Sequence, residues 1–398
     1  MQIGDKIRIT MLPARAGDCI LIEFLQEDYR ILIDGGYADT YDNYLRDKLL
    51  RLNKEGKRIQ LLIITHIDAD HIGGIQAFLK ENGSASKPNI IRVDEVWYNS
   101  FFNIYGEPEC TGNLPDYVRL MLQGKALQGT RECKKGNGDI SVTQGNTVAE
   151  LLSANGYRWN SSFEGKAVCV ENKESILLHD RIACRLLGPG EEELHKLTQY
   201  WIRDMKRNVR NFKIYEDELY NAAFEGTFLN DGTAEPERNT GNISYGAGKN
   251  RWDIQDYAAG WNHKIDTSIT NGSSIAFLLQ YEAITMLFPG DCPIQVFQEK
   301  LPGQIEVVKL PHHGSCANIS RKFIQETQVT YYLLSTNGEK YDHPSPCVIG
   351  SILRETPNRA KIVKNYEIEV LKTIGETEGD SYEWERQNCN NKNRKNNK

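Results

Sequence analysis

The sequence predicts a four-layer α/β sandwich, in which two β-sheets pack face to face and helices cover the outer side of each sheet. Two observations predict this class. Apolar runs of about four to eight residues suit strands that are buried on both faces. The plan of the N-terminal half also recurs in the C-terminal half: two paired strands, the second ending at an Asp beside Gly, a helical span, and a third strand ending at His. Such sheets need helices outside them, and the polar loops of the two halves would meet at one edge.

The N-terminal half supplies paired strands over 18–24 and 30–36, followed by a helical span over 41–52. A third apolar run, 59–64, leads into Thr-His-Ile-Asp-Ala-Asp-His-Ile-Gly-Gly, and a helix-like run follows over 72–80. Four side chains able to bind a metal lie between this strand and this helix: His66, Asp68, Asp70 and His71. A loop at the end of a strand can bring all four together. The alternative, four polar residues in a solvated turn, is disfavoured by the content of the second half.

The C-terminal half repeats this plan. Paired strands are expected over 274–281 and 284–291, the second ending in Gly-Asp, followed by a helical span over 294–300. The third strand, 306–310, runs into Pro-His-His-Gly-Ser. Because both halves contribute to one cleft, we expect a single domain over 1–375. A large, mainly helical insertion at about 100–265 would separate the halves.

Composition limits the class of protein. The 398 residues are 39% hydrophobic, which is enough for a core in a chain of this length. The net charge of −6 provides no global attraction to nucleic acid, so any such binding needs a local patch. Nine cysteines without a Cys-x-x-Cys pair argue against a disulfide framework or a zinc–thiolate site. No signal-peptide stretch or run of ~20 apolar residues is evident, so we expect a cytoplasmic protein without a membrane partner.

The insertion contains a basic stripe. Residues 201–213 have the pattern of an amphipathic helix. The basic side chains on its polar face are Arg203, Lys206, Arg207 and Arg210. They form either an ordinary solvated face or a contact for a nucleic-acid backbone. Residues 226–250, rich in Gly, Asn, Thr and Glu, are expected to form a long mobile loop, and residues 376–398 a disordered tail.

Four ordered motifs resemble those of the metallo-β-lactamase fold. They are Asp-Gly-Gly at 34–36, His-x-Asp-x-Asp-His-x-Gly-Gly at 66–74, Gly-Asp at 290–291 and Pro-His-His-Gly-Ser at 311–315. With Ser-Thr-Asn-Gly at 335–338 and Tyr-Asp-His-Pro at 341–344, they are most similar to the hydrolase domain of the ComEC/Rec2 DNA-uptake proteins. The resemblance covers about 12–80 and 270–350. ComEC-like proteins also carry a membrane channel, which this sequence lacks, so only the hydrolase part carries over.

The resemblance implies a site for two divalent metal ions. The implied ligands of one ion are His66, Asp68 and Asp291, and those of the other are Asp70, His71, Asp291 and His313, with Asp291 as the bridge. Asp68 stands where many members have His, and a carboxylate favours Mn²⁺ or Mg²⁺ more than an imidazole would, although Zn²⁺ stays open. The His of the usual third motif is not evident, because none of His179, His195 and His263 follows a strand with a glycine turn. The first ion would then be weakly held or completed by water.

Other residues acquire roles from the same motifs. His312 is expected to contact the scissile phosphate or donate a proton, or else to support the ligands structurally. His343 would bind phosphate at the edge of the cleft, or be structural, and Asp70 joins these two as the catalytic set. Asp34 is expected to hydrogen-bond a ligand His and set its tautomer. Asp18 would do the same nearby, or be a turn residue.

The leading function is a metal-dependent phosphodiesterase, specifically a DNase, that uses water activated by the metal pair. The alternative within hydrolases is a small phosphodiester or ester substrate, such as a cyclic nucleotide, a phosphocholine ester or a lactone. The segment Met-Leu-Pro-Ala…Gly-Asp-Cys at 11–19 also resembles the metallo-hydrolase of AVAST type I antiphage systems. That resemblance implies a bacterial defence component that works with other defence-system proteins, including an NTPase sensor, through assembly as well as cleavage.

Overall fold

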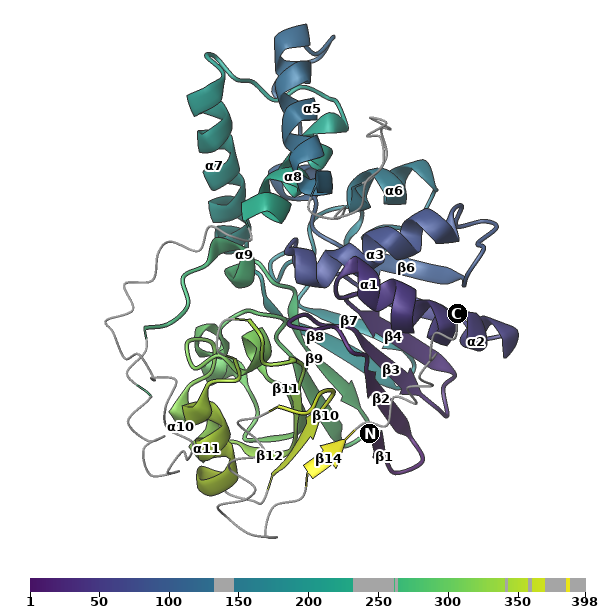
Figure 1. The fold of residues 1–398 in the computed structure, drawn as a ribbon, viewed down its shortest axis with the longest axis vertical. Coiled ribbons are helices and arrows are strands. Elements are labelled where there is room, and N and C mark those ends of the chain that lie inside the picture. The colour runs from purple at the N-terminus through teal and green to yellow at the C-terminus, as the bar shows by residue number, and fades with distance from the viewer. Residues whose placement is uncertain are drawn as a thin grey trace, which may run out of the picture.

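The computed structural model of the chain describes residues 1–131, 147–231, 261, 264–340, 343–356, 360–368 and 384–386. Two β-sheets lie face to face, and helices cover the outer side of each (Figure 1). One apolar core fills the space between the sheets, and two others lie between a sheet and its helices. The predicted four-layer αββα sandwich is confirmed.

The first sheet is formed by the N-terminal part of the chain. Its strands, in spatial order, are β1 (Gln2–Ile3), β2 (Ile7–Met11), β3 (Ile20–Phe24), β4 (Tyr29–Ile33), β5 (Ile59–Ile63) and β6 (Val93–Trp97). The pairs from β1 to β4 are antiparallel, whereas β4, β5 and β6 run parallel. Alternate residues of β3 enter different cores: Leu21 packs under the helices, and Ile20 and Ile22 face the second sheet. Both faces are buried, which explains the continuous apolar runs.

The second sheet contains the C-terminal strands and a hairpin from the middle of the chain. Its strands, in spatial order, are β14 (Trp384–Arg386), β13 (Lys361–Lys364), β12 (Gln328–Leu334), β11 (Gln304–Lys309), β10 (Ile284–Phe288), β9 (Ala276–Tyr281), β8 (Ile182–Gly188) and β7 (Ser175–His179). The β7–β8 hairpin falls within the range expected as a helical insertion. It joins the sheet beside β9 because Ile182, Cys184 and Leu186 alternate toward the core between the sheets.

The predicted disordered tail contains one described element. β14 lies within 376–398 and pairs in parallel with β13. The other residues of that range lie outside the part of the chain that the structure describes.

Helices cover both outer faces of the sandwich. On the first sheet these are α1 (Ala38–Thr40), a π-helical turn (Tyr41–Leu45), α2 (Arg46–Lys54), α3 (Ala69–Asn82) and α6 (Val148–Ala154). On the second sheet they are α10 (Arg321–Glu326) and α11 (Pro346–Glu355). The helical span predicted over 294–300 is instead two short 3₁₀ turns, Ile294–Val296 and Gln298–Lys300.

A helical lobe projects from one end of the sandwich (Figure 1). It contains α4 (Phe101–Tyr105), α5 (Asp116–Arg131), α7 (Glu191–Asn208) and α8 (Leu219–Asp231), and α9 (Ile269–Gly272) follows at its base. Aromatic rings fill its interior, with the rings of Phe101 and Trp201 4.7 Å apart. α8 approaches α5 closely at Gly226, where a Cβ would come within 2.3 Å of the carbonyl oxygen of Lys125. Residues 226–231, predicted to begin a mobile loop, are therefore helical, and 232–250 lie outside the described residues.

The predicted amphipathic helix is α7, and it ends earlier than the pattern indicates. Trp201 and Met205 are buried in the lobe, as the apolar side of the pattern requires. The helix stops at Asn208 because Val209 adopts an extended conformation, with φ −131° and ψ 116°. Arg210, the last residue of the basic stripe, therefore lies beyond the helix.

Candidate metal centre

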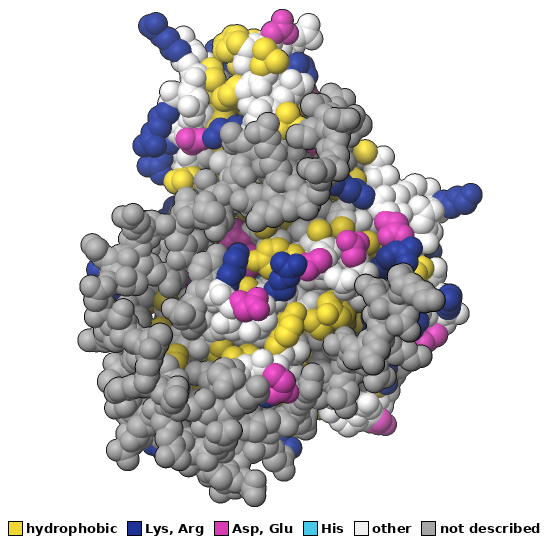
Figure 2. All heavy atoms as spheres, viewed as in Figure 1, with side chains coloured by type: hydrophobic (Ala, Val, Ile, Leu, Met, Phe, Trp, Pro, Cys, Tyr) yellow, Lys and Arg dark blue, Asp and Glu magenta, His cyan; other side chains and the backbone are white. Residues whose placement is uncertain are grey.

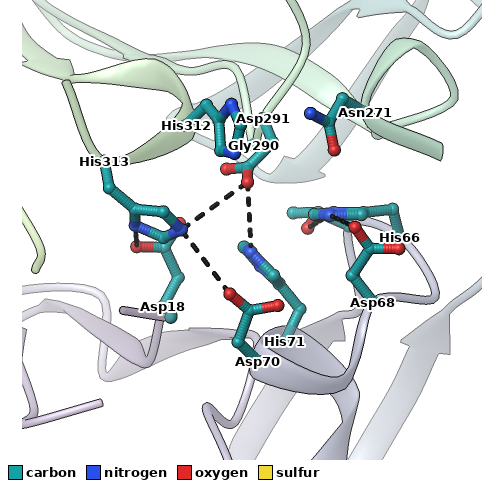
Figure 3. A network of polar contacts seen from close by, with 12 residues as sticks. Asp18, His66, Asp68, Asp70, His71, Asn271, Gly290, Asp291, His312 and His313 are labelled. Carbon is teal, nitrogen blue, oxygen red and sulfur yellow. Dashed lines mark hydrogen bonds and ion pairs between the residues drawn. The ribbon is translucent and has the colours of Figure 1, made fainter. Parts of the chain in front are cut away.

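Polar loops from both sheets meet at one edge of the sandwich and bring the six predicted ligands together (Figure 3). From the first sheet, the connection between β5 and α3 supplies His66, Asp68, Asp70 and His71. From the second sheet, the loop after β10 supplies Asp291, and the 3₁₀ turn after β11 supplies His313. The structure thus brings these six side chains to one edge of the sandwich, and their role as metal ligands stays a prediction.

α3 begins earlier than predicted. Asp68 is its N-cap residue, so Asp70 and His71 occupy the first turn instead of preceding the helix. Asp68 makes no capping hydrogen bond with its side chain, which leaves its carboxylate available to the centre. The helix approaches the loop after β4 so closely that a Cβ on Gly74 would lie 2.0 Å from the carbonyl oxygen of Gly35. Glycine is therefore required there, as the Gly-Gly motif indicates.

Asp291 lies at the middle of the cluster. Its Oδ2 is 3.4 Å from Nε2 of His71 and 3.6 Å from Nε2 of His313. Asp70 approaches from the helix, with Oδ2 3.9 Å from Nε2 of His313. On the other side, Nε2 of His66 is 3.6 Å from Oδ2 of Asp68. Two groups of candidate ligands face the cleft: His66, His71 and Asp291, and Asp70, His71 and His313. A third group, Asp18, Asp34 and His71, lies behind them.

Nδ1 of each of the three candidate ligand imidazoles faces a hydrogen-bond acceptor. Nδ1 of His71 is 2.8 Å from Oδ2 of Asp34, and Nδ1 of His313 is 2.8 Å from the carbonyl oxygen of Ser335. Both partners only accept, so each Nδ1 carries the hydrogen.

The hydroxyl of Thr65 sets the third tautomer. It donates to Asp34 at 2.7 Å, and its oxygen lies 3.0 Å from Nδ1 of His66, so it accepts the hydrogen of that imidazole. With Nδ1 engaged in this way, the three Nε2 atoms face the cluster.

The donor set fits divalent metal ions. Among the described residues, no hydrogen-bond partner faces Nε2 of His66, His71 or His313, although all three atoms are buried. Buried polar atoms are otherwise satisfied almost everywhere in proteins. Neutral imidazoles held from behind by Nδ1–H bonds, with carboxylates between them, are the arrangement of protein metal sites.

The ionisation of each side chain in the cluster depends on burial and on its charged neighbours. Burial opposes ionisation of Asp291, but Lys309, His71 and His313 outweigh burial and hold the pKa of Asp291 well below its usual range. Burial similarly opposes ionisation of Asp68, and the neighbouring His66 outweighs it and lowers the pKa of Asp68. Both carboxylates are therefore anionic near neutral pH. Burial lowers the pKa of His313, so that imidazole is neutral.

Metal binding is expected to strengthen as pH rises. Burial disfavours the imidazolium of His71, but Asp291 and Asp34 outweigh burial and raise the pKa of His71 well above 6.5. Below that raised pKa a metal ion must displace a proton from Nε2. The Kd for Mn²⁺, measured by calorimetry from about pH 6 to 9, should therefore fall by up to about tenfold per pH unit. A Kd that does not change with pH would contradict this coupling.

The raised pKa of His71 has the opposite consequence for the stability of the metal-free protein, which should fall as pH rises. The raised pKa of His71 contributes stability that is fully present below the unfolded value of 6.5 and is lost as pH rises through the folded pKa. The metal-free melting temperature should accordingly fall over the range in which metal binding tightens.

Lys309 is a member of the cluster that the motif analysis missed. It ends β11, is 1% exposed, and forms ion pairs with Asp18 and, at 3.3 Å, with Oδ1 of Asp291. Its ammonium also donates to the carbonyl oxygen of Gly290 at 3.1 Å. Asp291 thus uses Oδ1 for Lys309 and turns Oδ2 toward the imidazoles. The available signal was a lysine within an otherwise apolar strand that ends at a ligand loop.

Asp18 and Asp34 lie directly behind the ligands. Asp34 accepts from His71, the role predicted for it. Asp18 accepts from Lys309, while its Oδ1 stays 3.9 Å from Nδ1 of His313. Its main partner is therefore a lysine and not a ligand imidazole.

His312 and His343 lie together beside the ligands, with ring centroids 5.0 Å apart. Nδ1 of His312 is 3.3 Å from Oδ1 of Asn318 and 3.7 Å from Oδ2 of Asp266. His312 and His313 both have left-handed backbone angles, with φ 43° and 57°, and their ring planes differ by 63°. The two consecutive imidazoles therefore point in different directions: His313 points toward Asp291, and His312 points toward Asn318. Neither Asp266 nor Asn318 lies within a recognised sequence motif.

The basic stripe is not part of the cluster. Arg203, Lys206, Arg207 and Arg210 are exposed on the lobe. Figure 2 shows lysine and arginine side chains along the edge of the lobe where α7 lies in Figure 1. α7 packs against α9, the short helix that carries Asn271 into the centre.

The remaining histidines are placed elsewhere. Nδ1 of His179 on β7 is 3.4 Å from a carboxylate oxygen of Glu27, and His195 is exposed on α7. His263 lies outside the described residues. No helix among the described segments combines the length and apolar character needed to cross a membrane.

Comparison with known families supports the fold. Residues 12–119 match the family model described as the Metallo-beta-lactamase superfamily. The matched part contains the β5–α3 connection with its four candidate ligands. No curated protein matches the chain. The chain therefore has the αββα fold of the metallo-β-lactamases, and its residues 12–119 are similar to that superfamily.

Proposed function

We propose that the protein is a metal-dependent phosphodiesterase that holds two divalent ions and cleaves DNA. The supporting observation is the meeting of three buried imidazoles at the carboxylate of Asp291: Nε2 of His71 and of His313 lie 3.4 and 3.6 Å from its Oδ2, and His66 belongs to the same group as His71 and Asp291. One ion would be held by His66, Asp68 and Asp291. The other would be held by Asp70, His71, Asp291 and His313. Asp68 in place of an imidazole favours Mn²⁺ or Mg²⁺, with Zn²⁺ as the softer alternative.

When bound, the two ions would supply an activated water and neutralise the charge that develops on phosphorus oxygens. The chain itself would handle the proton of the leaving group. Nδ1 of His312 lies 3.3 Å from Oδ1 of Asn318, which positions the imidazole beside the cluster, where it would give a proton to the leaving group. His343 packs against the His312 ring and would hold it in place or contact a phosphate oxygen.

The proposed activity is tested by a metal-supplemented nuclease assay. The purified protein with Mn²⁺ should degrade DNA, and EDTA should stop it. Asp70→Ala should be inactive under the same conditions, because Asp70 contributes to one of the two ligand groups. Cleavage of bis-p-nitrophenyl phosphate without any polynucleotide cleavage would favour the alternative, a small phosphodiester or ester substrate. Absence of both activities would contradict the proposal.

The basic stripe supports a polynucleotide substrate. Because the whole chain has a charge of −6, a local patch is needed to bind DNA. Changing Arg203, Lys206, Arg207 and Arg210 to glutamine should weaken DNA binding. It should also reduce the slope of log K against log salt by up to about 0.9 for each phosphate that the variant no longer neutralises.

Four exposed basic residues elsewhere provide the matched control for this experiment. They are Arg51, Lys54, Arg58 and Lys87. Glutamine at these positions should leave the slope unchanged. Equal slopes in the two quadruple variants would show that the stripe is only a solvated face.

A role in antiphage defence is the second candidate. The segment 11–19 and the motif set support it, and the helical lobe offers a surface for assembly with other defence proteins, including an NTPase sensor. Tyr117 and Leu120 on α5 are 58% and 68% exposed. Phage plaque counts on cells carrying the gene with its neighbours should fall for the wild type and not for His71→Ala.

A further inference from the structure

The two proposed ion positions differ in the number and type of their ligands. Of the two proposed ion positions, the one at Asp70 has two imidazoles and two carboxylates. The other has His66, Asp68 and a share of Asp291. Among the residues that the structure describes, no imidazole takes the place of the third-motif His at that position. Among the described histidines, only His66, His71 and His313 belong to the ligand groups.

Asn271 occupies the neighbourhood of the incomplete position. It lies on α9, is 4% exposed, and its backbone NH donates to the side chain of Ser268 at 3.3 Å. The chain then runs directly to β9, and the NH of Ile275 donates to the carbonyl oxygen of Thr65 at 2.9 Å. This hydrogen bond joins the Asn271 segment to the residue preceding His66.

The orientation of the Asn271 carboxamide is determined by its partner. Its nitrogen donates to Oδ2 of Asp266 at 2.7 Å. A carboxylate only accepts, so the nitrogen must face Asp266 and the oxygen must face the other way. Figure 3 shows this oxygen pointing toward His66 and Asp68. The neighbouring Thr270 donates to Oδ2 of Asp68 at 3.4 Å, so α9 also contacts a ligand directly.

Asp266 is itself anchored. The same Oδ2 accepts from the amide of Asn318 at 2.8 Å, and that amide nitrogen also donates to the carbonyl oxygen of Asp291 at 2.8 Å. One carboxylate thus links α9 to the loop that carries Asp291. A buried network of this kind holds its members in one geometry, which a ligand oxygen requires.

We propose that Oδ1 of Asn271 is a ligand of the ion held by His66, Asp68 and Asp291, in place of the missing imidazole. Asp266 is the positioning residue that aims it. This inference rests on the proposed two-ion centre. A carboxamide oxygen is a neutral, hard ligand of the kind that Mn²⁺ and Mg²⁺ accept more readily than Zn²⁺ does. Asn271 in place of an imidazole therefore favours the same metals as Asp68 does, since each residue replaces a nitrogen ligand by an oxygen ligand at this ion.

The test measures Mn²⁺ binding by calorimetry and by metal content, so it does not depend on turnover. The wild type should bind two ions. In Asn271→Ala, one of the two Kd values should rise at least about tenfold, the loss typical for groups that support a metal, and the other should change little. Asn271→His should restore the second ion and shift the preference toward Zn²⁺, because Nδ1–H can donate to Asp266 and leave Nε2 for the metal.

Two further variants make the outcome decisive. Asn82→Ala removes an asparagine that is as deeply buried at the far end of α3, and both Kd values should stay at the wild-type values. Asp266→Ala keeps Asn271 but releases its amide, so it should weaken the same ion. Unchanged Kd values in a folded Asn271→Ala or Asp266→Ala protein would overturn the role of Asn271. A wild type that binds no metal would instead overturn the proposed function.

Discussion

Replacing His71 by alanine is expected to abolish metal binding and hydrolysis together. His71 belongs to each group of side chains that converges at the centre, and its Nε2 lies 3.4 Å from Oδ2 of Asp291. The substitution removes a ligand and leaves Asp34 without the imidazole to which it is hydrogen-bonded. Metal content after dialysis should fall to background. Cleavage should fall on the order of 100-fold or more, the upper range for disturbing the groups around a metal.

His195→Ala is the matched control, because that imidazole is exposed on α7 and belongs to no ligand group. It should keep wild-type metal content and cleavage. Circular dichroism of the metal-free proteins separates ligand loss from unfolding. A folded His71→Ala protein that still binds two ions and cleaves substrate would show that the centre is assigned wrongly.

Lys309→Met is expected to destabilise the metal-free protein more than any other single change to the cluster. Burial disfavours the charge on Lys309, but Asp18 and Asp291 outweigh burial and raise its pKa, so the ammonium is present at neutral pH. The substitution leaves two carboxylates, 2% and 3% exposed, without their shared cation. Breaking a buried ion pair in this way costs about 3–5 kcal/mol. Thermal melting in EDTA should show the loss.

Metal and a second substitution should each return part of this stability. Mn²⁺ would supply positive charge beside Asp291, and Lys309→Met combined with Asp18→Asn removes one of the unpaired charges. Lys364→Met on neighbouring β13 is the control, since this lysine is also mostly buried but pairs with a half-exposed Glu367. If Lys309→Met melts at the same temperature as Lys364→Met and the wild type, the ion pairs of Lys309 contribute little to the stability of the protein.

The strands and the ligand loops were predictable because their signals are local. Each core strand is a short apolar run, and each ligand loop follows such a run directly. The same reasoning placed the exposed side of α7 and the glycines at which α3 approaches its neighbouring loop. The errors arise where tertiary contacts override local pattern. α3 begins before the apolar run does, with Asp68 in the N-cap position, and 226–231 are helical where Gly226 packs against α5.

Residues far apart in the chain supply what the motifs do not contain. Asp18 and Lys309 are 291 positions apart, as their residue numbers give, yet they share an ion pair. Asp266 and Asn271 follow a long segment without recognisable motifs. Only the packing of α9 brings Asn271 beside the centre, where its neighbour Thr270 contacts Asp68. The β7–β8 hairpin has an ordinary strand pattern, but its place beside β9 depends on which sheet edge is available.

The sequence by itself determined the kinds of ligand and their local order: imidazoles and carboxylates in short loops that follow buried strands. Those features depend on neighbours in the chain, so they can be recognised without a fold. The tertiary structure alone decided which nitrogen of each imidazole faces the cluster, which oxygen of Asp291 is held by Lys309, and where the amide of Asn271 points. These are choices between atoms of one side chain, and they are made by hydrogen-bond and ion-pair partners that only folding brings within reach.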